Sequence, residues 1–119
     1  TIFGDGEQTR DFVNVHDVAA ANIRAGLAQG VSAVFNIGSA TRITINELAR
    51  VMHEIAAVQS TLRYAPPRMG DVRDSLADIQ AARSAFGFDP ATQMAQGLAE
   101  YWAWFSRDGL TLKRLGIAT

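Results

Sequence analysis

Apolar residues recur at helical spacing in four stretches of the chain, which predicts four helices separated by polar segments. Residues that cap helix N-termini stand before three of these stretches, at Asp17, Thr44 and Asp78. Thr44 and Glu47 have the spacing of a capping box, in which each side chain accepts a hydrogen bond from the backbone N–H of the other residue. The expected helices cover about residues 18–29, 45–58, 79–86 and 92–105.

Runs rich in β-branched and aromatic residues predict short strands at residues 12–15, 33–37 and 61–64. Thr1-Ile2-Phe3 has the character of the middle of a strand, and the first residue is not Met, so we expect the chain to be part of a longer polypeptide. Four helices with a few short strands predict an α+β fold, a small and mostly helical lobe. The strands are too few to form an independent sheet-based domain.

The charge balance argues against large anionic partners. The 119 residues carry 11 basic and 12 acidic side chains, a net charge of −1, so no basic field is available to attract nucleic acid or an anionic membrane. No stretch approaches the ~20 consecutive apolar residues that span a bilayer. The absence of cysteine excludes disulfides and thiolate sites and fits a cytoplasmic location. Any anion that the protein binds must therefore be held by a few well-placed groups.

The first polar loop, residues 3–12, offers one such group, Arg10, just before an expected strand. A guanidinium presents a planar set of donors that matches phosphate oxygens, and it keeps its charge at ordinary pH. The alternative is that Arg10 lies at the surface and pairs with Asp11 or Glu7.

The second polar loop, residues 66–75, offers another such group. Two prolines stiffen its start, and Gly70 allows the backbone to come close to a partner. Arg68 can bind a second phosphate oxygen, and Asp71 can accept hydrogen bonds from two sugar hydroxyls at once. The alternative is a solvated loop whose Arg–Asp pairs add little stability.

Other kinds of site find less support in the sequence. A third polar loop, residues 36–39, is explained as well by a strand end with a capping residue. His16 and His53 have no companions at ligand spacing, so we expect no metal site. Ser39 and Ser75 have no His nearby in the sequence to activate them as nucleophiles. The glycine-rich G-x-G-x-x-G loop that binds dinucleotides between a strand and a helix is also absent.

Four blocks of the sequence form one ordered pattern. They are Gly4-Asp5-Gly6-x-Gln8-x-Arg10-Asp11-Phe12-Val13-x-Val15-x-Asp17-Val18, then Asn36-Ile37-Gly38-Ser39 with Thr44-x-x-Glu47-Leu48, then Arg68-x-Gly70-Asp71-Val72-Arg73-x-Ser75-x-Ala77-Asp78 with Ala82-Arg83 and Gly87, and last Gly97-Leu98 with Trp104-Phe105. In this order they resemble one family, the extended short-chain dehydrogenase/reductases of the NAD-dependent nucleotide-sugar epimerase and dehydratase type. The resemblance covers about residues 1–107. Ala40 stands where the second block of that family usually ends in Gly.

The resemblance implies a two-lobed enzyme in which an N-terminal Rossmann domain binds NAD and carries a catalytic Tyr-x-x-x-Lys pair. Residues 1–107 of this chain resemble the C-terminal lobe, which holds the substrate, and residues 108–119 form a tail. Neither Tyr64 nor Tyr101 has Lys four residues later, so the catalytic pair is missing and the chain alone is expected to be inactive and to bind no cofactor. The implied partners are a nucleoside diphosphate sugar, the Rossmann domain of the same polypeptide, and a second copy in a homodimer.

The same resemblance implies roles for five residues. Arg10 and Arg68 would bind the diphosphate, and Asp71 would bind the ribose hydroxyls. Phe3 would lie beside the base and contact it through its backbone. Ser75 falls where some members place a larger, ring-bearing residue near the substrate.

Two other functions stay open at this point. The chain can derive from a member of the family that has lost catalysis and acts in regulation or assembly. It can also be a free-standing interaction module whose apolar last helix docks a partner. The catalytic Tyr-x-x-x-Lys pair and the glycine-rich loop, if found upstream in the whole protein, would distinguish an enzyme from both.

Overall fold

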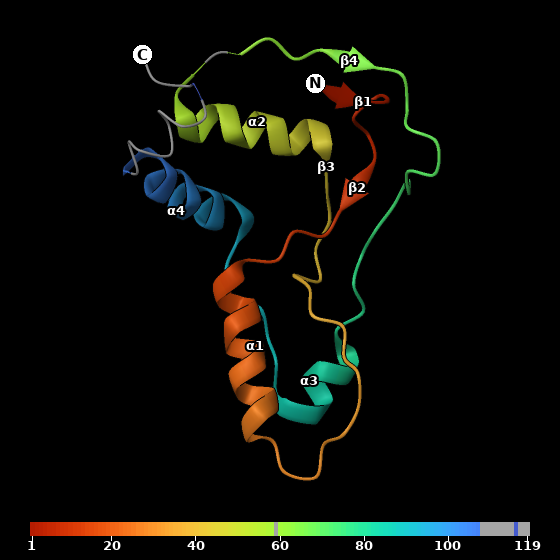
Figure 1. The fold of residues 1–119 in the computed structure, drawn as a ribbon, viewed down its shortest axis with the longest axis vertical. Helices are drawn as coiled ribbons and strands as arrows, with labels where there is room; N and C mark the ends of the chain where they lie inside the picture. The colour runs from red at the N-terminus through yellow and green to blue at the C-terminus, as the bar shows by residue number, and fades with distance from the viewer. Residues whose placement is uncertain (59, 108–115, 117–119) are drawn as a thin grey trace.

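The computed structural model describes residues 1–58, 60–107 and 116 (Figure 1). It has the predicted α+β fold, with four helices that each lie within three residues of the expected bounds. The predicted tail, residues 108–119, lies outside the described residues except for Gly116. The helices are α1 (Val15–Leu27), α2 (Ile45–Ala56), α3 (Gln80–Phe86) and α4 (Met94–Arg107).

The described strands form two separate pairs, not one sheet. The strand predicted at residues 61–64 begins three residues later. The strands predicted at residues 12–15 and 33–37 are wrong, because neither segment has a ladder partner among the described residues. Their residue types favour an extended backbone, but a strand also needs a neighbour to hydrogen-bond. The pairs are β1 (Ile2–Phe3) with β4 (Tyr64–Ala65) in parallel, and β2 (Thr9–Arg10) with β3 (Ile43–Thr44) antiparallel.

Helix α1 begins earlier than predicted because Asn14, and not Asp17, caps it. The Oδ1 atom of Asn14 accepts a hydrogen bond from the N–H of His16 at 2.8 Å. Asp17 is buried in the first turn. Its carboxylate accepts hydrogen bonds from the backbone N–H groups of Ala91 and Thr92 at 3.2 and 3.1 Å. Asp17 therefore ties α1 to the segment that leads into α4.

The residues predicted to cap α2 and α3 do bind backbone N–H groups. Thr44 Oγ1 accepts from the N–H of Glu47 at 3.0 Å. The Glu47 carboxylate bonds the Arg50 guanidinium at 2.6 Å, so an ion pair takes the place of the second half of the capping box. Asp78 Oδ1 accepts from the N–H of Gln80 at 2.9 Å. Local sequence therefore sets both helix starts.

Two apolar regions hold the fold together. One lies around α1 and α3, where Ala21, Ile79, Ala82 and Phe88 are buried together. The other lies where α2 packs against α4. Figure 1 shows α1 and α3 in the lower half of the molecule and α2 and α4 in the upper half, joined by long extended segments.

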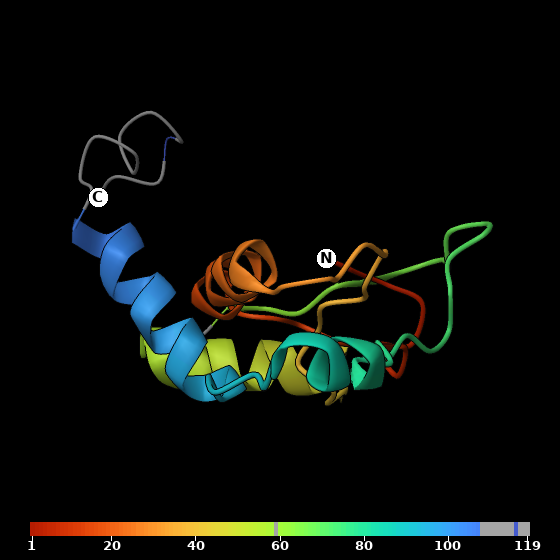
Figure 2. The same ribbon diagram turned by 90° about the horizontal axis from the view of Figure 1, so that it is seen from below.

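The molecule is flat and open. Its principal extents are 52 × 35 × 22 Å, and its radius of gyration is 17.2 Å. A compact chain of this length would have a radius of about 13.5 Å. Figure 2, seen along the long axis, shows α1 displaced to one side of the layer that contains α2 and α3. Within the part of the chain that the structure describes, no helix is both long and apolar enough to cross a membrane.

Candidate functional site

Arg10 stands on β2, whose pairing with β3 fixes its backbone. Its Nη1 atom donates to the backbone oxygen of Thr9 at 2.7 Å, and its Nη2 atom donates to Asp71 Oδ1 at 2.6 Å. The pairing of Arg10 with Asp11 or Glu7, considered from the sequence, is wrong, because a residue 61 positions away is the partner. A guanidinium has five N–H donors, so these two bonds leave donors for a further oxyanion.

Arg68 lies over the ring of Phe3, the last residue of β1. Its Cζ atom is 3.7 Å from the ring centroid, a distance at which the cation is attracted to the face of the ring. The chain turns directly after Arg68, where the N–H of Asp71 donates to the Arg68 carbonyl oxygen at 3.2 Å. Gly70 has φ of +81°, a conformation that only glycine adopts without strain, so the turn requires it.

These contacts gather four of the five predicted substrate-binding residues, which we name the arginine cluster: Phe3, Arg10, Arg68 and Asp71. Arg10 bonds Asp71, Asp71 closes the turn with Arg68, and Arg68 lies on Phe3. The Arg10 guanidinium therefore contacts one end of the turn of residues 68–71, and Arg68 stands at the other end. The members come from two segments that are distant in sequence, the loop around β1 and β2 and the loop of residues 66–75.

Ser75, the fifth predicted residue, does not belong to the arginine cluster. It is exposed and lines a shallow hollow of about 290 Å³ together with Asp11, Asn36 and Gly38. The third polar loop, residues 36–39, therefore meets Ser75 and not the arginine cluster.

Asp11 has a role that sequence reasoning missed. Its Oδ1 atom accepts hydrogen bonds from the N–H and the hydroxyl of Ser39 at 2.7 and 2.6 Å, and its Oδ2 atom accepts from the N–H of Ala77 at 3.2 Å. A Cβ atom on Gly38 would lie 2.5 Å from Ala77 Cβ and 2.7 Å from Asp11 Oδ2, so this junction needs glycine. The signal in the sequence was the Gly-Ser pair, which is small enough to pack against a carboxylate. The junction anchors the residue next to Arg10.

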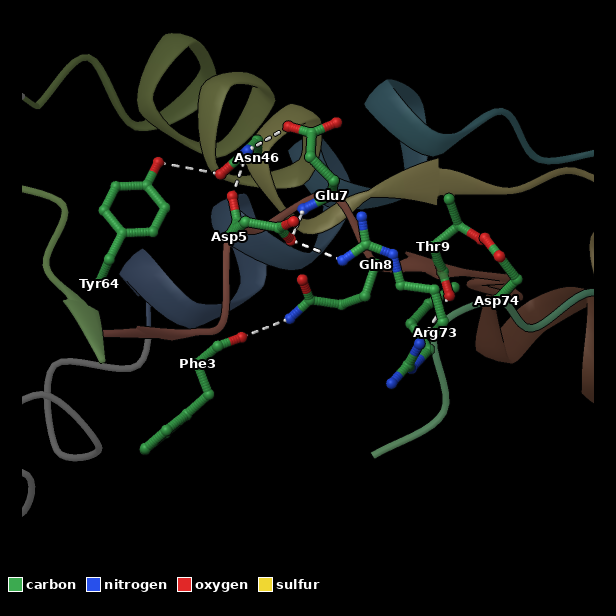
Figure 3. A network of polar contacts seen from close by, with 10 residues as sticks. Phe3, Asp5, Glu7, Gln8, Thr9, Asn46, Tyr64, Arg73 and Asp74 are labelled. Carbon is green, nitrogen blue, oxygen red and sulfur yellow. Dashed lines mark hydrogen bonds and ion pairs between the residues drawn. The ribbon is translucent and has the colours of Figure 1, made fainter. Parts of the chain in front are cut away.

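Asn46, at the start of α2, holds the loop between β1 and β2 (Figure 3). Its Nδ2 atom donates to the Asp5 carbonyl oxygen at 3.0 Å and to Glu7 Oε1 at 2.6 Å. Its Oδ1 atom accepts from the Tyr64 hydroxyl at 3.0 Å. A Cβ atom on Gly6 would lie 2.0 Å from that oxygen, so a larger residue at position 6 would displace Asn46.

Arg73 and Asp74 attach the second polar loop to the first. Arg73 Nη1 pairs with Asp5 Oδ1 at 2.7 Å. This hydrogen bond, with a smaller contribution from the backbone N–H of Glu7, holds the pKa of Asp5 below its ordinary value of 3.8, and the same pair raises the pKa of Arg73. The hydroxyl of Thr9 donates to Asp74 Oδ1 at 2.7 Å. Because these groups are exposed, the pairs add little stability, and their main effect is to align the two loops.

An apolar groove of about 570 Å³ lies elsewhere, between α2, α4 and β1. Leu48 and Met52 of α2 face Leu98 and Trp102 of α4 across it. It is larger than the hollow at Ser75, but no Arg or Lys lines it, and neither does any of the five predicted residues. A phosphate needs a cation or several N–H donors, so the arginine cluster is the better candidate site.

The described residues contain no group of three or more His, Asp or Glu arranged to hold a metal ion. His53 Nε2 lies 2.5 Å from the Ser60 hydroxyl at the other end of α2 from the arginine cluster. The chemistry available at the arginine cluster is therefore that of cation, carboxylate and aromatic ring, which suits binding and positioning.

The chain is similar to proteins that are named for nucleotide sugars. Residues 1–38 match the model of the NAD dependent epimerase/dehydratase family. A UDP-glucose 4-epimerase of Mycolicibacterium smegmatis is 36% identical over 104 residues, which make up 87% of this chain and 33% of that protein. The chain thus spans about one third of the length of this relative.

Two solved structures share the fold over most of the chain. The UDP-glucose 4-epimerase of Thermotoga maritima, determined with UDP-glucose, has 40% sequence identity and a TM-score of 0.84, over 89% of this chain and 34% of that one. MoeE5, in complex with UDP-glucuronic acid and NAD, has 37% identity and a TM-score of 0.83, over 89% of this chain and 36% of that one.

Proposed function

This chain is a relative of the NAD-dependent epimerases and dehydratases, and we propose that, within such an enzyme, its residues 1–107 bind the nucleoside diphosphate of a nucleotide sugar. The lobe would hold the sugar in place while the rest of the enzyme performs a transient hydride transfer. The observation that supports this most directly is the arginine cluster, in which Arg10 contacts the end of the turn that Arg68 begins.

Two guanidinium groups suit a diphosphate because it presents negative oxygens on two adjacent phosphorus atoms. Each charge-assisted hydrogen bond of this kind contributes about 1.5–3 kcal/mol. The chain as a whole has a net charge of −1, so attraction to the diphosphate has to come from these local groups. Arg10 is already braced by the Thr9 carbonyl oxygen, which limits the side-chain entropy that binding would cost.

Asp71 and Phe3 complete the proposed site. A carboxylate can accept hydrogen bonds from the 2′- and 3′-hydroxyls of ribose together, and Asp71 lies directly beside the guanidinium that would hold the phosphate. Phe3 would lie next to the base, with its ring already engaged by Arg68. Ser75 would contact the substrate only if the ligand extends to the hollow that Ser75 lines.

The described residues do not fit an NAD site. A dinucleotide is held by a glycine-rich turn between a strand and the helix that follows it. Gly4-Asp5-Gly6 leads into strand β2, and the residues just before α1 and α2 contain no glycine. We therefore assign no step of the chemistry to a cofactor on this chain, and we place catalysis on the remainder of the enzyme.

The remainder of the enzyme would pack on the apolar surface that the chain leaves exposed. Val15, Ile23 and Leu27 of α1 are 72%, 65% and 75% exposed, and Val34 is 97% exposed. Since an apolar surface of this kind is unusual on an independent domain, we propose that it lies against the NAD-binding lobe of the same polypeptide.

A second candidate function is a separate interaction module that docks a partner through α4. Tyr101 and Trp104 of this helix are 56% and 55% exposed, which favours this candidate. Thermal melting and size-exclusion of the chain separate the two. A sharp melt that is independent of concentration would favour the module, whereas association or marginal stability would favour a lobe that needs its neighbour.

Calorimetry with UDP tests the binding function directly. We expect Arg10→Ala and Arg68→Ala each to weaken UDP binding about 10- to 100-fold, the equivalent of one lost charge-assisted hydrogen bond. Arg50→Ala on the outer face of α2 is the matched control and should leave UDP affinity unchanged. In the intact enzyme, Arg68→Ala should raise the KM for the nucleotide sugar strongly and leave NAD affinity nearly unchanged. Equal loss of both affinities would count against the assignment.

A further inference from the structure

Gln8 is a buried polar residue two positions before Arg10, and the proposed function gives it no role. It is 9% exposed. Its Nε2 atom donates to the Phe3 carbonyl oxygen at 2.7 Å, but its Oε1 atom is buried without a hydrogen-bond partner among the described residues. An amide that is buried with one end unbonded costs free energy, so stability alone favours an apolar residue at this position.

Gln8 links the segments that carry the two arginines. Through its side chain it holds the backbone of Phe3, whose ring supports the Arg68 guanidinium. Its backbone belongs to the segment that carries Arg10, which follows two residues later in β2. This segment is held to the start of α2, because the Gln8 carbonyl oxygen accepts a hydrogen bond from the N–H of Ile45 at 3.2 Å. A change in the side chain of Gln8 would therefore move Phe3 relative to Arg10.

The Gln8 amide and Pro67, at the start of the second polar loop, both lie close to Gly4. Its Oε1 atom is 3.9 Å from the point that a Cβ atom on Gly4 would occupy, and Pro67 Cβ is 3.8 Å from the same point. Figure 3 shows the Gln8 side chain reaching toward the Phe3 carbonyl group. Gly4, which follows Phe3 in the chain, is thus a point that both the Gln8 amide and the residue before Arg68 approach.

We propose that Gln8 is a positioning residue that sets the separation between the Arg10 and Arg68 guanidinium groups by fixing Phe3. This role presupposes the proposed function, the binding of a nucleoside diphosphate. A diphosphate needs two cations at a definite separation, whereas one cation is enough for a monophosphate. Gln8 should therefore matter more for binding the diphosphate than for binding the monophosphate.

Calorimetry of the full chain with UDP and with UMP tests this role. Gln8→Met keeps the length of the side chain and removes both the NH2 group and the carbonyl oxygen of the amide. Gln93→Met, at an exposed glutamine before α4, is the matched control. We expect Gln8→Met to weaken UDP binding about tenfold and UMP binding less than about threefold, and the control to change neither. An equal loss for both ligands would overturn the role of Gln8 and leave the proposed function standing. A chain that binds no UDP before any substitution would overturn both.

Side-chain NMR gives a second measurement that needs no ligand. The ring current of Phe3 shifts the protons of a guanidinium that lies on its face, so the Arg68 Nε–H signal reports their stacking. Gln8→Met should move this signal toward the value of an unstacked arginine, and Gln93→Met should not. If Gln8→Met fails to fold, Gln8→Leu takes its place, because it also lacks the amide that donates to the Phe3 carbonyl oxygen and should produce the same shift. An Arg68 signal that is unchanged in a folded Gln8 variant would overturn the proposal.

Discussion

The Asp71 carboxylate accepts a hydrogen bond from the Arg10 guanidinium at 2.6 Å, across 61 positions of sequence. The two side chains are 39% and 26% exposed, so solvent screens the pair and its contribution to stability is small. Its effect is geometric, because it holds the turn of residues 68–71 beside β2. A bound phosphate would use the Arg10 donors that Thr9 and Asp71 leave over, and the second carboxylate oxygen of Asp71 would be available to a sugar hydroxyl.

Substitution of Asp71 should remove the preference for ribose. In Asp71→Asn, a single amide oxygen replaces two carboxylate oxygens, so the 2′- and 3′-hydroxyls can no longer be held together. We expect the ratio of UDP to 2′-deoxy-UDP affinity to fall about 5-fold, the equivalent of one weak hydrogen bond. Competition calorimetry measures this ratio, and Asp89→Asn, at an exposed carboxylate beside Arg83, is the control. An unchanged ratio in Asp71→Asn would remove Asp71 from the ribose site.

Substitution of Phe3 should loosen Arg68 without unfolding the chain. Phe3→Leu keeps an apolar side chain at the end of β1 but loses the aromatic face that attracts the cation. Because Arg68 is exposed, the loss should amount to about 0.5–1 kcal/mol, and UDP affinity should fall about 2- to 5-fold. Tyr101→Leu on α4 provides the control, since Tyr101 lies away from the arginine cluster. Equal effects of the two substitutions would show that the ring of Phe3 does not act through Arg68.

Gly38 should not accept even a methyl group. Its Cβ would lie 2.5 Å from Ala77 Cβ and 2.7 Å from Asp11 Oδ2, so Gly38→Ala must push the Asp11 junction apart. We expect a loss of about 1–3 kcal/mol in the free energy of unfolding. Gly26→Ala, on the exposed side of α1 with no atom within 4 Å of the new Cβ, should instead gain about 1 kcal/mol from helix propensity. The urea concentration at the midpoint of unfolding should therefore fall in Gly38→Ala and rise in Gly26→Ala.

The C-terminus of α2 carries strain that glycine should relieve. Ala57 caps this helix with φ of +52°, in the left-handed region that disfavours a side chain. It is exposed, so removal of its methyl group costs no packing. Ala57→Gly should raise the free energy of unfolding by about 0.5–1 kcal/mol. Ala99→Gly, within α4, should lower it by about 1 kcal/mol, and thermal melting that shows the same sign for both would contradict the assigned backbone conformation.

Acid should weaken the attachment of the two polar loops. The Arg73 hydrogen bond lowers the pKa of Asp5 below 3.8, so the unfolded chain takes up this proton at higher pH than the folded chain. The stability that Asp5 contributes is therefore complete above roughly pH 5 and is lost as the pH falls through its folded pKa. Between roughly pH 6 and pH 3, the free energy of unfolding should fall less in Asp5→Asn than in the unaltered chain. Equal losses in urea titrations would show that the pair does not form in solution.

Features set by neighbouring residues were predictable from the sequence. The helix starts at Thr44 and Asp78 follow from hydrogen bonds that span three residues or fewer, and both form. The α+β class follows from the periodic apolar pattern. Asp17 was assigned wrongly because an Asx residue at a helix start can also serve a distant partner, and the burial that reveals this depends on the tertiary structure.

Features set by distant segments were not predictable in the same way. Residues 33–37 have the composition of a strand, but pairing depends on a neighbour that composition does not reveal. Arg10 was a candidate from its chemistry, but its partner Asp71 lies 61 positions away, and two nearer carboxylates competed for the assignment. Gln8 shows the same limit, because a glutamine in a polar loop gives no sign that it will be buried.

The two segments that supply the arginine cluster differ in how well they should tolerate substitutions and insertions. Arg10 lies in a paired strand next to the three-way junction of Asp11, so an insertion there would break several bonds at once. Arg68 sits in a loop whose residues 66–76 are all exposed. Diversification toward new sugars or bases should therefore accumulate in the residues of this loop other than Arg68, Gly70 and Asp71, while β2 stays constant. Exchange of this loop between homologues should therefore alter ligand preference with less damage to the fold than substitutions in β2.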